Sequence, residues 1–245
     1  MKLTADAKGT FAIAPTPFHD DGRIDERSID RLTDFYEEVG CDGVTVLGIL
    51  GEAPKLDAAE AVGTDVPFVL QDYPLAIGVV MTPGVIRRIV QDNPSCVMLK
   101  HEDWPGLEKI SALRGFEKDG SMRHVSILTG NGGLFLDFEM ERGADGAMTG
   151  YCFPDMLVDV VRLSKAGQRD KAHDLFDAHL PLVRYEQQQG VGLAVRKYVM
   201  MRRGVLASDA QRKPAGMLSS TAKAEVDYLL SRLGRSDQRA LKLAA

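Results

Sequence analysis

The sequence has few cysteines and no long apolar run, and these absences exclude several classes of protein. Only three of its 245 residues are cysteine, Cys41, Cys96 and Cys152, and they lie far apart in apolar stretches. An odd number of scattered cysteines matches neither a disulfide framework nor a CxxC metal site. No segment approaches the roughly 20 apolar residues of a membrane helix, and the first residues lack an apolar signal core. We therefore expect a cytoplasmic protein in a reducing compartment.

The sequence also lacks an excess of positive charge. It carries 30 Lys and Arg against 35 Asp and Glu, a net charge of -5. Nucleic acids and anionic membranes attract basic surfaces, so neither is expected as a partner. The histidines show no metal-ligand spacing, and TGNGG at 129–133 completes neither a Walker loop nor a dinucleotide fingerprint. The composition thus favours a small-molecule partner, without a metal or an organic cofactor.

Short apolar segments alternate with longer amphipathic ones, which is typical of parallel β/α architecture. Strands are predicted over residues 11–15, 43–48, 67–71, 96–100, 126–130 and 146–149. Helices are predicted over residues 26–39, 82–92, 106–117, 134–142 and 155–166. The phrases EVGCDGVTVLG and ERGADGAMTG resemble each other, as repeated β/α units do.

After Gly167 the strand signal ends. Residues 168–204 and 218–233 are predicted to be helical, separated by the turn-rich SDAQRKPAG. We therefore divide the chain into a β/α barrel body over 9–166 and a C-terminal helical extension over 167–235. The tail after Arg235 is expected to fray.

The stretch SCVMLKHEDW, residues 95–104, places a lysine at the end of a buried strand. In a parallel β/α barrel, side chains at this end of a strand face the mouth where active sites form. Desolvation disfavours an ammonium there and makes the Lys100 amine a nucleophile toward a carbonyl. His101 and Glu102 could supply acid/base chemistry, although alternation turns His101 away from Lys100. Alternatively, Lys100 pairs with Glu102 or Asp103 or extends to solvent, and periodicity alone does not decide.

Several motifs, in order, resemble the dihydrodipicolinate synthase / N-acetylneuraminate lyase family. FAIAPTPFHDDGRID at 11–25 is similar to the family's A-x-x-T-P-F and D-G-x-I-D, and GCDGVTVLGILGEAPKLDAAE at 40–60 to its second strand and G-T-T-G-E loop. CVMLKHED at 96–103 is similar to the strand that ends in the Schiff-base lysine. Residues 127–150 resemble the last two barrel strands, and QRKP at 211–214 the turn before the final helix.

This resemblance implies a fold, an activity and a set of site residues. The fold is an α/β TIM (β/α)8-type barrel with a C-terminal helical extension. The activity is that of a class I aldolase-type lyase or synthase on pyruvate or a related 2-keto acid, with dehydration as a close variant. Lys100 would form the imine, and homo-dimers or homo-tetramers are expected. The residues expected to contact substrate are Leu50, Gly51, Gln71, Gly130, Met148 and Thr149, with the backbone amides of the first two holding its carboxylate.

The sequence departs from the family pattern at several functional positions. The two threonines of the family's proton relay are Ile49 and Leu50 here, and its general acid/base tyrosine is Gln71, which cannot transfer protons near neutral pH. Tyr73 is the expected substitute, and packing at the mouth is its alternative role. The arginine of true dihydrodipicolinate synthases falls at Ala76, which argues against that reaction. A catalytically degraded keto-acid-binding or scaffold protein is therefore the alternative function.

The sequence is also shorter than the family pattern between LDAAEA at 56–61 and VGTDVPFVL at 62–70. Here the resemblance implies two further strands and their helices. Because a barrel of ~250 residues has eight units, the loss of about two units corresponds to ~60 residues. Removing two strands opens the sheet and exposes its edges. Either this sequence omits a segment of the natural protein, which we favour, or the protein is a deletion form, or another chain covers the gap.

Overall fold

A computed structural model of the chain describes residues 3–13, 15, 17, 19–21, 25–45, 67–103, 106–211 and 216–243. Its strands are β1 (Gly9–Ile13), β2 (Gly43–Thr45), β3 (Phe68–Asp72), β4 (Cys96–His101), β5 (Ser126–Thr129) and β6 (Gly146–Thr149). They form one parallel sheet in the order β2-β1-β6-β5-β4-β3. Each predicted strand segment overlaps an observed strand, although β1 runs two residues earlier than the predicted 11–15, and residues 46–48 of the second segment lie outside the described residues.

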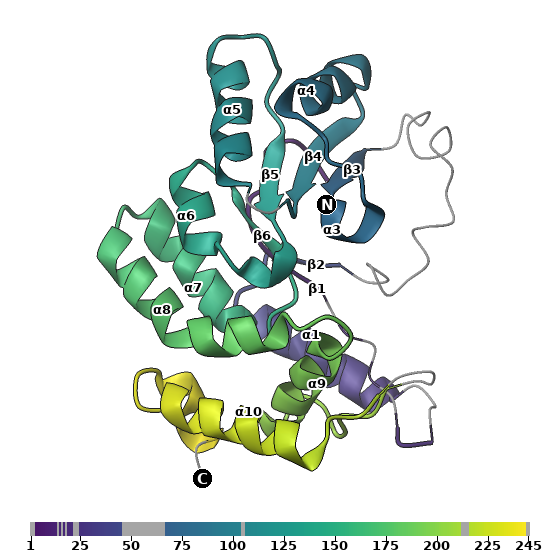
Figure 1. The fold of residues 1–245 in the computed structure, drawn as a ribbon, viewed down its shortest axis with the longest axis vertical. Helices are drawn as coiled ribbons and strands as arrows, with labels where there is room; N and C mark the ends of the chain where they lie inside the picture. The colour runs from purple at the N-terminus through teal and green to yellow at the C-terminus, as the bar shows by residue number, and fades with distance from the viewer. Residues whose placement is uncertain are drawn as a thin grey trace.

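The strand order shows where the sheet is interrupted. β2 and β3 follow each other in the described sequence but lie at opposite edges of the sheet (Figure 1). In a closed eight-stranded barrel, consecutive strands are neighbours all the way round. The observed order is that of such a barrel with two strands removed between β2 and β3. The predicted gap therefore lies at the point where the sheet is open.

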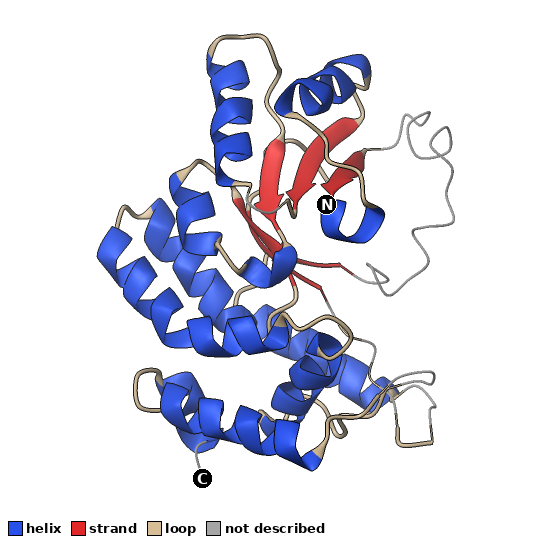
Figure 2. Ribbon diagram, viewed as in Figure 1, coloured by secondary structure: helices blue, strands red, loops and turns tan. Residues whose placement is uncertain are grey.

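Helices follow the strands and cover the outside of the sheet (Figure 2). They are α1 (Glu26–Glu38), α3 (Pro74–Ile77), α4 (Pro83–Asp92), α5 (Leu107–Lys118), α6 (Leu136–Glu141) and α7 (Pro154–Lys165), with a 3-10 turn, η2 (Asn131–Gly133), after β5. Two of these helices are capped by the side chain before their first residue: Asp25 accepts a hydrogen bond from Ser28 N, and Thr82 accepts one from Val85 N. Within the described residues, no helix has the length and apolar character needed to cross a membrane.

The two faces of the sheet have different cores. Met98, Leu128 and Met148 pack together on the inner face, one each from β4, β5 and β6. Leu99 and Ile127 face the other way and pack with residues of α4 and α5. Because side chains alternate along a strand, Lys100 shares the inner face with Met98, and His101 shares the outer face with Leu99.

The C-terminal part is helical, with α8 (Arg169–Glu186), α9 (Gly192–Arg202), α10 (Ser220–Leu233) and a final 3-10 helix, η3 (Gln238–Leu243). One apolar cluster runs from α7 through α8 and α9 to α10, so the extension shares a core with the body. The expected fraying after Arg235 is wrong for η3, because Ala240 is fully buried in this cluster. The division at residues 166 and 167 stays a prediction.

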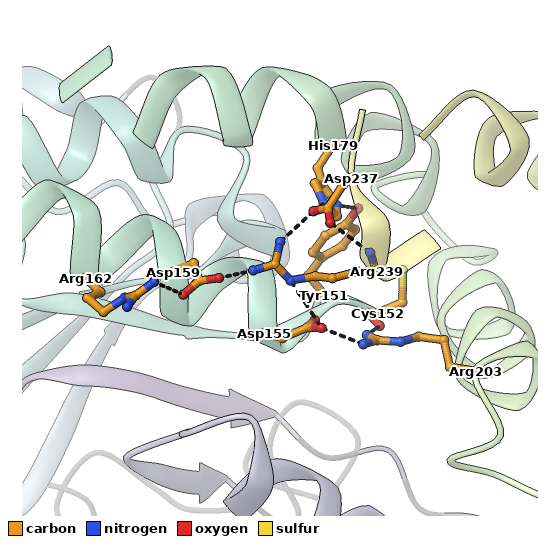
Figure 3. Close-up of polar contacts among 9 residues, drawn as sticks. All are labelled: Tyr151, Cys152, Asp155, Asp159, Arg162, His179, Arg203, Asp237 and Arg239. Atoms are coloured by element: carbon orange, nitrogen blue, oxygen red, sulfur yellow. Dashed lines mark hydrogen bonds and ion pairs between the residues drawn. The ribbon is translucent and has the colours of Figure 1, made fainter. Parts of the chain in front are cut away.

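A polar network also ties η3 to the barrel body (Figure 3). The Tyr151 hydroxyl lies 2.9 Å from His179 Nδ1, and His179 Nε2 lies 2.8 Å from Asp237 Oδ2. Arg239 donates to both Asp237 and Asp159, which extends the network from the chain end to α7. Buried polar groups with this many partners rigidify the contact that they join.

Candidate active site at the strand ends

Lys100 lies on the inner face of β4, one residue before the strand ends. In the sheet it is paired with Gln71 on β3 and Leu128 on β5. Its side chain is only 7% exposed, and Nζ lies 2.9 Å from Glu102 Oε1. Of the alternatives that the sequence left open, the structure has the pair with Glu102, and extension into solvent is wrong. The chemical role of Lys100 stays a prediction.

Glu102 is held on three sides at the end of β4, and its side chain is only 4% exposed. Gln71 Nε2 donates to Oε1 at 2.5 Å, and the backbone N–H of Asn131 donates to Oε2 at 3.0 Å. Its own backbone N–H donates to the carbonyl of Asp72 at 2.9 Å. The carboxylate therefore joins β3, β4 and the turn after β5 around the amine of Lys100. Sequence reasoning missed the Asn131 amide, for which the residue type gives no signal.

Gly130 makes room for this carboxylate. A Cβ at Gly130 would lie 2.3 Å from Glu102 Cγ, which no real contact allows. The Gly130 N–H donates to the carbonyl of His101 at 2.8 Å, so the two chain segments are closely paired here. The predicted site residue Gly130 thus borders Glu102, as Gln71 does.

Tyr73 follows β3 and is half-buried at the start of α3. Burial raises the pKa of its phenol above the ordinary value, and the negative charge of Glu102 raises that pKa further. The phenol therefore stays protonated near neutral pH, so it could donate a proton.

The other predicted substrate contacts are more scattered. Met148 lies on the inner face with Met98 and Leu128. Thr149 is buried on the opposite side of the strand from Met148, and its methyl group approaches Gly133. Leu50 and Gly51 lie outside the described residues. Contact of these four residues with substrate stays a prediction.

His101 lies on the outer face, away from Lys100, as alternation predicts. Its ring is fully buried, and Nδ1 lies 3.8 Å from Asp72 Oδ2. It therefore belongs to a different polar group from Lys100 and Glu102.

Comparison with known proteins agrees with this architecture. The sequence model of the Dihydrodipicolinate synthetase family matches residues 6–63 and again residues 61–233. The two matches meet where the sequence predicts the missing units.

Two curated relatives and one solved structure illustrate the likeness. The L-2-keto-3-deoxyarabonate dehydratase of Azospirillum brasilense is 23% identical over 296 residues, with 92% of this chain and 94% of that protein covered. A 4-hydroxy-tetrahydrodipicolinate synthase of Chlorobium luteolum is 24% identical over 300 residues, with 94% and 99% covered. A dihydrodipicolinate synthase structure from Rhodopseudomonas palustris is 62% identical, with a TM-score of 0.88 and 95% and 99% covered.

Both alignments to the curated relatives are longer than this chain of 245 residues. These relatives therefore carry residues with no counterpart here, which is consistent with an internal deletion. The predicted fold class is confirmed, as a TIM-type barrel that is short of about two units. The chain belongs to the dihydrodipicolinate synthetase family of class I aldolase-type lyases, as an atypical member in which the sheet formed by the described strands is open between β2 and β3.

Proposed function

We propose that this chain is a Schiff-base-forming lyase or synthase that acts on pyruvate or a related 2-keto acid. Aldol cleavage or condensation is the reaction type, and dehydration through the same imine is its close variant. The observation that carries the proposal is the buried pair of Lys100 Nζ and Glu102 Oε1, 2.9 Å apart at the end of β4. The family relationship supports it, because the relatives named above include synthases and a dehydratase.

The pair provides the proton transfer that imine formation requires. Lys100 passes one ammonium proton to Glu102, and the neutral amine adds to C2 of the keto acid. In the resulting carbinolamine a proton moves from nitrogen to oxygen through the Glu102 carboxyl group. The C2 hydroxyl then leaves as water when Glu102 returns a proton to it, which gives the protonated imine on Lys100. The imine withdraws electrons from C3 and lowers the barrier to bond cleavage there.

The remaining residues of the proposal bind and orient. Gln71 and the Asn131 amide hold Glu102 toward Lys100, and neither exchanges a proton itself. Tyr73 is the second proton-transfer group, which replaces the relay that the family's threonines and tyrosine supply. The amides of Leu50 and Gly51 hold the substrate carboxylate.

The rest of the pocket lining belongs to the same proposal. Gly130 and Met148 line the site around the bound keto acid, and Thr149, whose side chain lies on the other side of β6, would reach it only through its backbone. A homo-dimer or homo-tetramer is part of the proposal as well, and light scattering of the purified protein would measure it.

Borohydride trapping tests the proposal directly. The protein is incubated with pyruvate, or with 2-keto-3-deoxy acids of five and six carbons, and then reduced. Peptide mapping should find the reduced adduct on the peptide that contains Lys100, and Lys100→Arg, which keeps the positive charge beside Glu102, should form none. Tight keto-acid binding without any adduct would instead support the binding or scaffold alternative. An adduct on another lysine would contradict the assignment of Lys100.

A further inference from the structure

A second polar cluster is buried on the outer face of β3 and β4, directly behind Gln71, Lys100 and Glu102. This outer cluster consists of Asp72, His101, Asp103 and Lys109. Asp72 and His101 have no exposed side-chain surface, and the Lys109 side chain is only 8% exposed. The proposed chemistry uses none of these groups, and buried charges are kept only where they are compensated.

Lys109, in the first turn of α5, forms ion pairs with both carboxylates of the cluster. Its Nζ lies 2.7 Å from Asp72 Oδ2 and 2.5 Å from Asp103 Oδ2. Burial alone raises the pKa of Asp72, but the hydrogen bond and the charge of Lys109, together with the electrostatic effect of His101 3.8 Å away, bring that pKa below its ordinary value. Asp72 therefore stays ionised near neutral pH, and the ion pair between β3 and α5 persists.

Asp72 and His101 of the outer cluster also accept backbone hydrogen bonds from residues that form the inner-face site. Asp72 follows Gln71 directly, and its carbonyl accepts the hydrogen bond from Glu102 N at 2.9 Å. The carbonyl of His101 accepts the hydrogen bond from Gly130 N at 2.8 Å. A displacement of Asp72 would therefore move both Glu102, which lies against the amine of Lys100, and Gln71, which donates a hydrogen bond to Glu102.

We propose that Asp72 and Lys109 are positioning residues for the Lys100–Glu102 pair. Their buried ion pair clamps the carboxyl ends of β3 and β4 against α5 and thereby keeps Glu102 within hydrogen-bond distance of Lys100. This inference rests on the proposed function in one respect, that Lys100 and Glu102 are the reacting pair. A misplacement of about 1 Å in such a pair can cost on the order of 100-fold in rate, although the positioning groups never touch substrate.

The same helix offers a matched control at its other end. Arg114 of α5 pairs with Glu117 and Asp145, and it also donates to the carbonyls of Val125 and Gly143. These contacts lie at the amino ends of β5 and β6. Lys100 lies near the carboxyl end of β4, at the opposite end of the sheet. Lys109 and Arg114 therefore both attach α5 to strands, but only Lys109 does so at the proposed site.

The experiment compares Lys109→Met, Lys109→Arg and Arg114→Met in the full chain. The rate of borohydride-trappable pyruvate adduct formation is measured against pyruvate concentration, together with Tm. Lys109→Met should lower the maximal rate about tenfold or more, with the half-saturating pyruvate concentration changed less than about twofold, because geometry and not binding is lost. Lys109→Arg should restore most of the rate. Arg114→Met should lower Tm but leave the rate within about twofold.

Two results would overturn the positioning role. One is a wild-type rate in Lys109→Met, and the other is an equal loss of rate in Lys109→Met and Arg114→Met. If Lys109→Met does not fold, Asp72→Asn takes its place, because it removes the charge and keeps the shape. The same two results then decide.

Hydrogen exchange separates this inference from the proposed function. If the wild-type protein forms no adduct, the proposed function fails, and exchange at the amides of Glu102 and Gly130 tests the clamp without chemistry. Faster exchange at these two amides in Lys109→Met but not in Arg114→Met supports the clamp. Equal exchange in the two variants overturns it.

Discussion

The inner and outer faces of β3 and β4 each bury a lysine against a carboxylate, and the two pairs have different surroundings. Lys100 and Lys109 are almost equally buried, with side chains 7% and 8% exposed. Lys109 lies between two carboxylates, those of Asp72 and Asp103. In the part of the chain that the structure describes, Lys100 pairs with Glu102, whose other partners are neutral amide groups.

This difference fits the separate roles that we propose for the two lysines, structural for Lys109 and reactive for Lys100. Removal of the proton from a lysine between two carboxylates would leave two buried negative charges uncompensated. When a lysine and a single carboxylate exchange a proton, both become neutral and no charge is left unpaired. Lys100 and Lys109 do not differ in burial, but they differ in the number of carboxylates that they contact.

Of the changes considered, removal of the charge from Glu102 should have the largest effect on the rate of adduct formation. Glu102→Gln keeps an oxygen for Gln71 to donate to, but it cannot accept a proton from Lys100. Because general acid–base groups contribute on the order of 100-fold or more, we expect adduct formation with pyruvate to fall at least about 100-fold. The trapping rate at pH 7 measures this loss.

Glu117→Gln is the control, because Glu117 forms its ion pair with Arg114, away from the site. It should leave the trapping rate unchanged. A trapping rate for Glu102→Gln within about threefold of wild type would show that another group accepts the proton of Lys100.

Two glycines offer the next comparison, one on each face. A Cβ at Gly130 would lie 2.3 Å from Glu102 Cγ, and one at Gly106 would lie 2.2 Å from His101 Nε2. Gly130→Ala should displace Glu102 and lower the trapping rate about tenfold. Gly106→Ala should act on the packing of His101 and destabilise the fold by about 1–3 kcal/mol, with a smaller effect on rate.

Trapping rates and Tm of the two alanine variants, measured side by side, check this division. If both variants lose rate in proportion to Tm, the two faces do not have the separate roles that we assign to them.

The sequence was sufficient to place the strands and to identify which of their ends carries Lys100. A period of two predicts that His101 points away from Lys100, and the structure confirms it. The outer cluster could not be predicted, because Lys109 reads as an ordinary polar residue in the first turn of a helix. Its partner Asp72 lies 37 positions away in the sequence. Only the folded packing of α5 on β3 brings these two charges together.

The sequence also could not predict which carboxylate pairs with Lys100. Glu102 and Asp103 are both near enough along the chain to pair with it. The strand continues through His101, so Glu102 returns to the inner face, whereas Asp103 reaches Lys109 instead. Because the strand extends by one residue, to His101, Glu102 pairs with Lys100 and Asp103 pairs with Lys109.

Acid should weaken the outer ion pair in a predictable direction. The folded-state pKa of Asp72 lies below its ordinary value of 3.8, so its ionisation stabilises the fold above about pH 4, and this contribution is lost as pH falls through the folded pKa. Asp72→Asn should therefore lower Tm near pH 7 by about 2–4 °C, equivalent to about 1 kcal/mol. The difference from wild type should shrink toward pH 3, and a difference that is constant from pH 7 to pH 3 would contradict this linkage.

The smallest effect expected is that of Tyr73→Phe, which removes the phenol and retains the ring. Since the pKa of Tyr73 is raised by burial and by the charge of Glu102, the phenol can donate a proton at neutral pH but not accept one. The variant should therefore form the adduct at the wild-type rate but return protons to C3 of bound pyruvate a few-fold more slowly. Exchange of the pyruvate methyl protons in D2O, followed by NMR, measures this step separately from imine formation. Unchanged exchange would leave Tyr73 with a packing role, and the proton that returns to C3 would then come from Glu102.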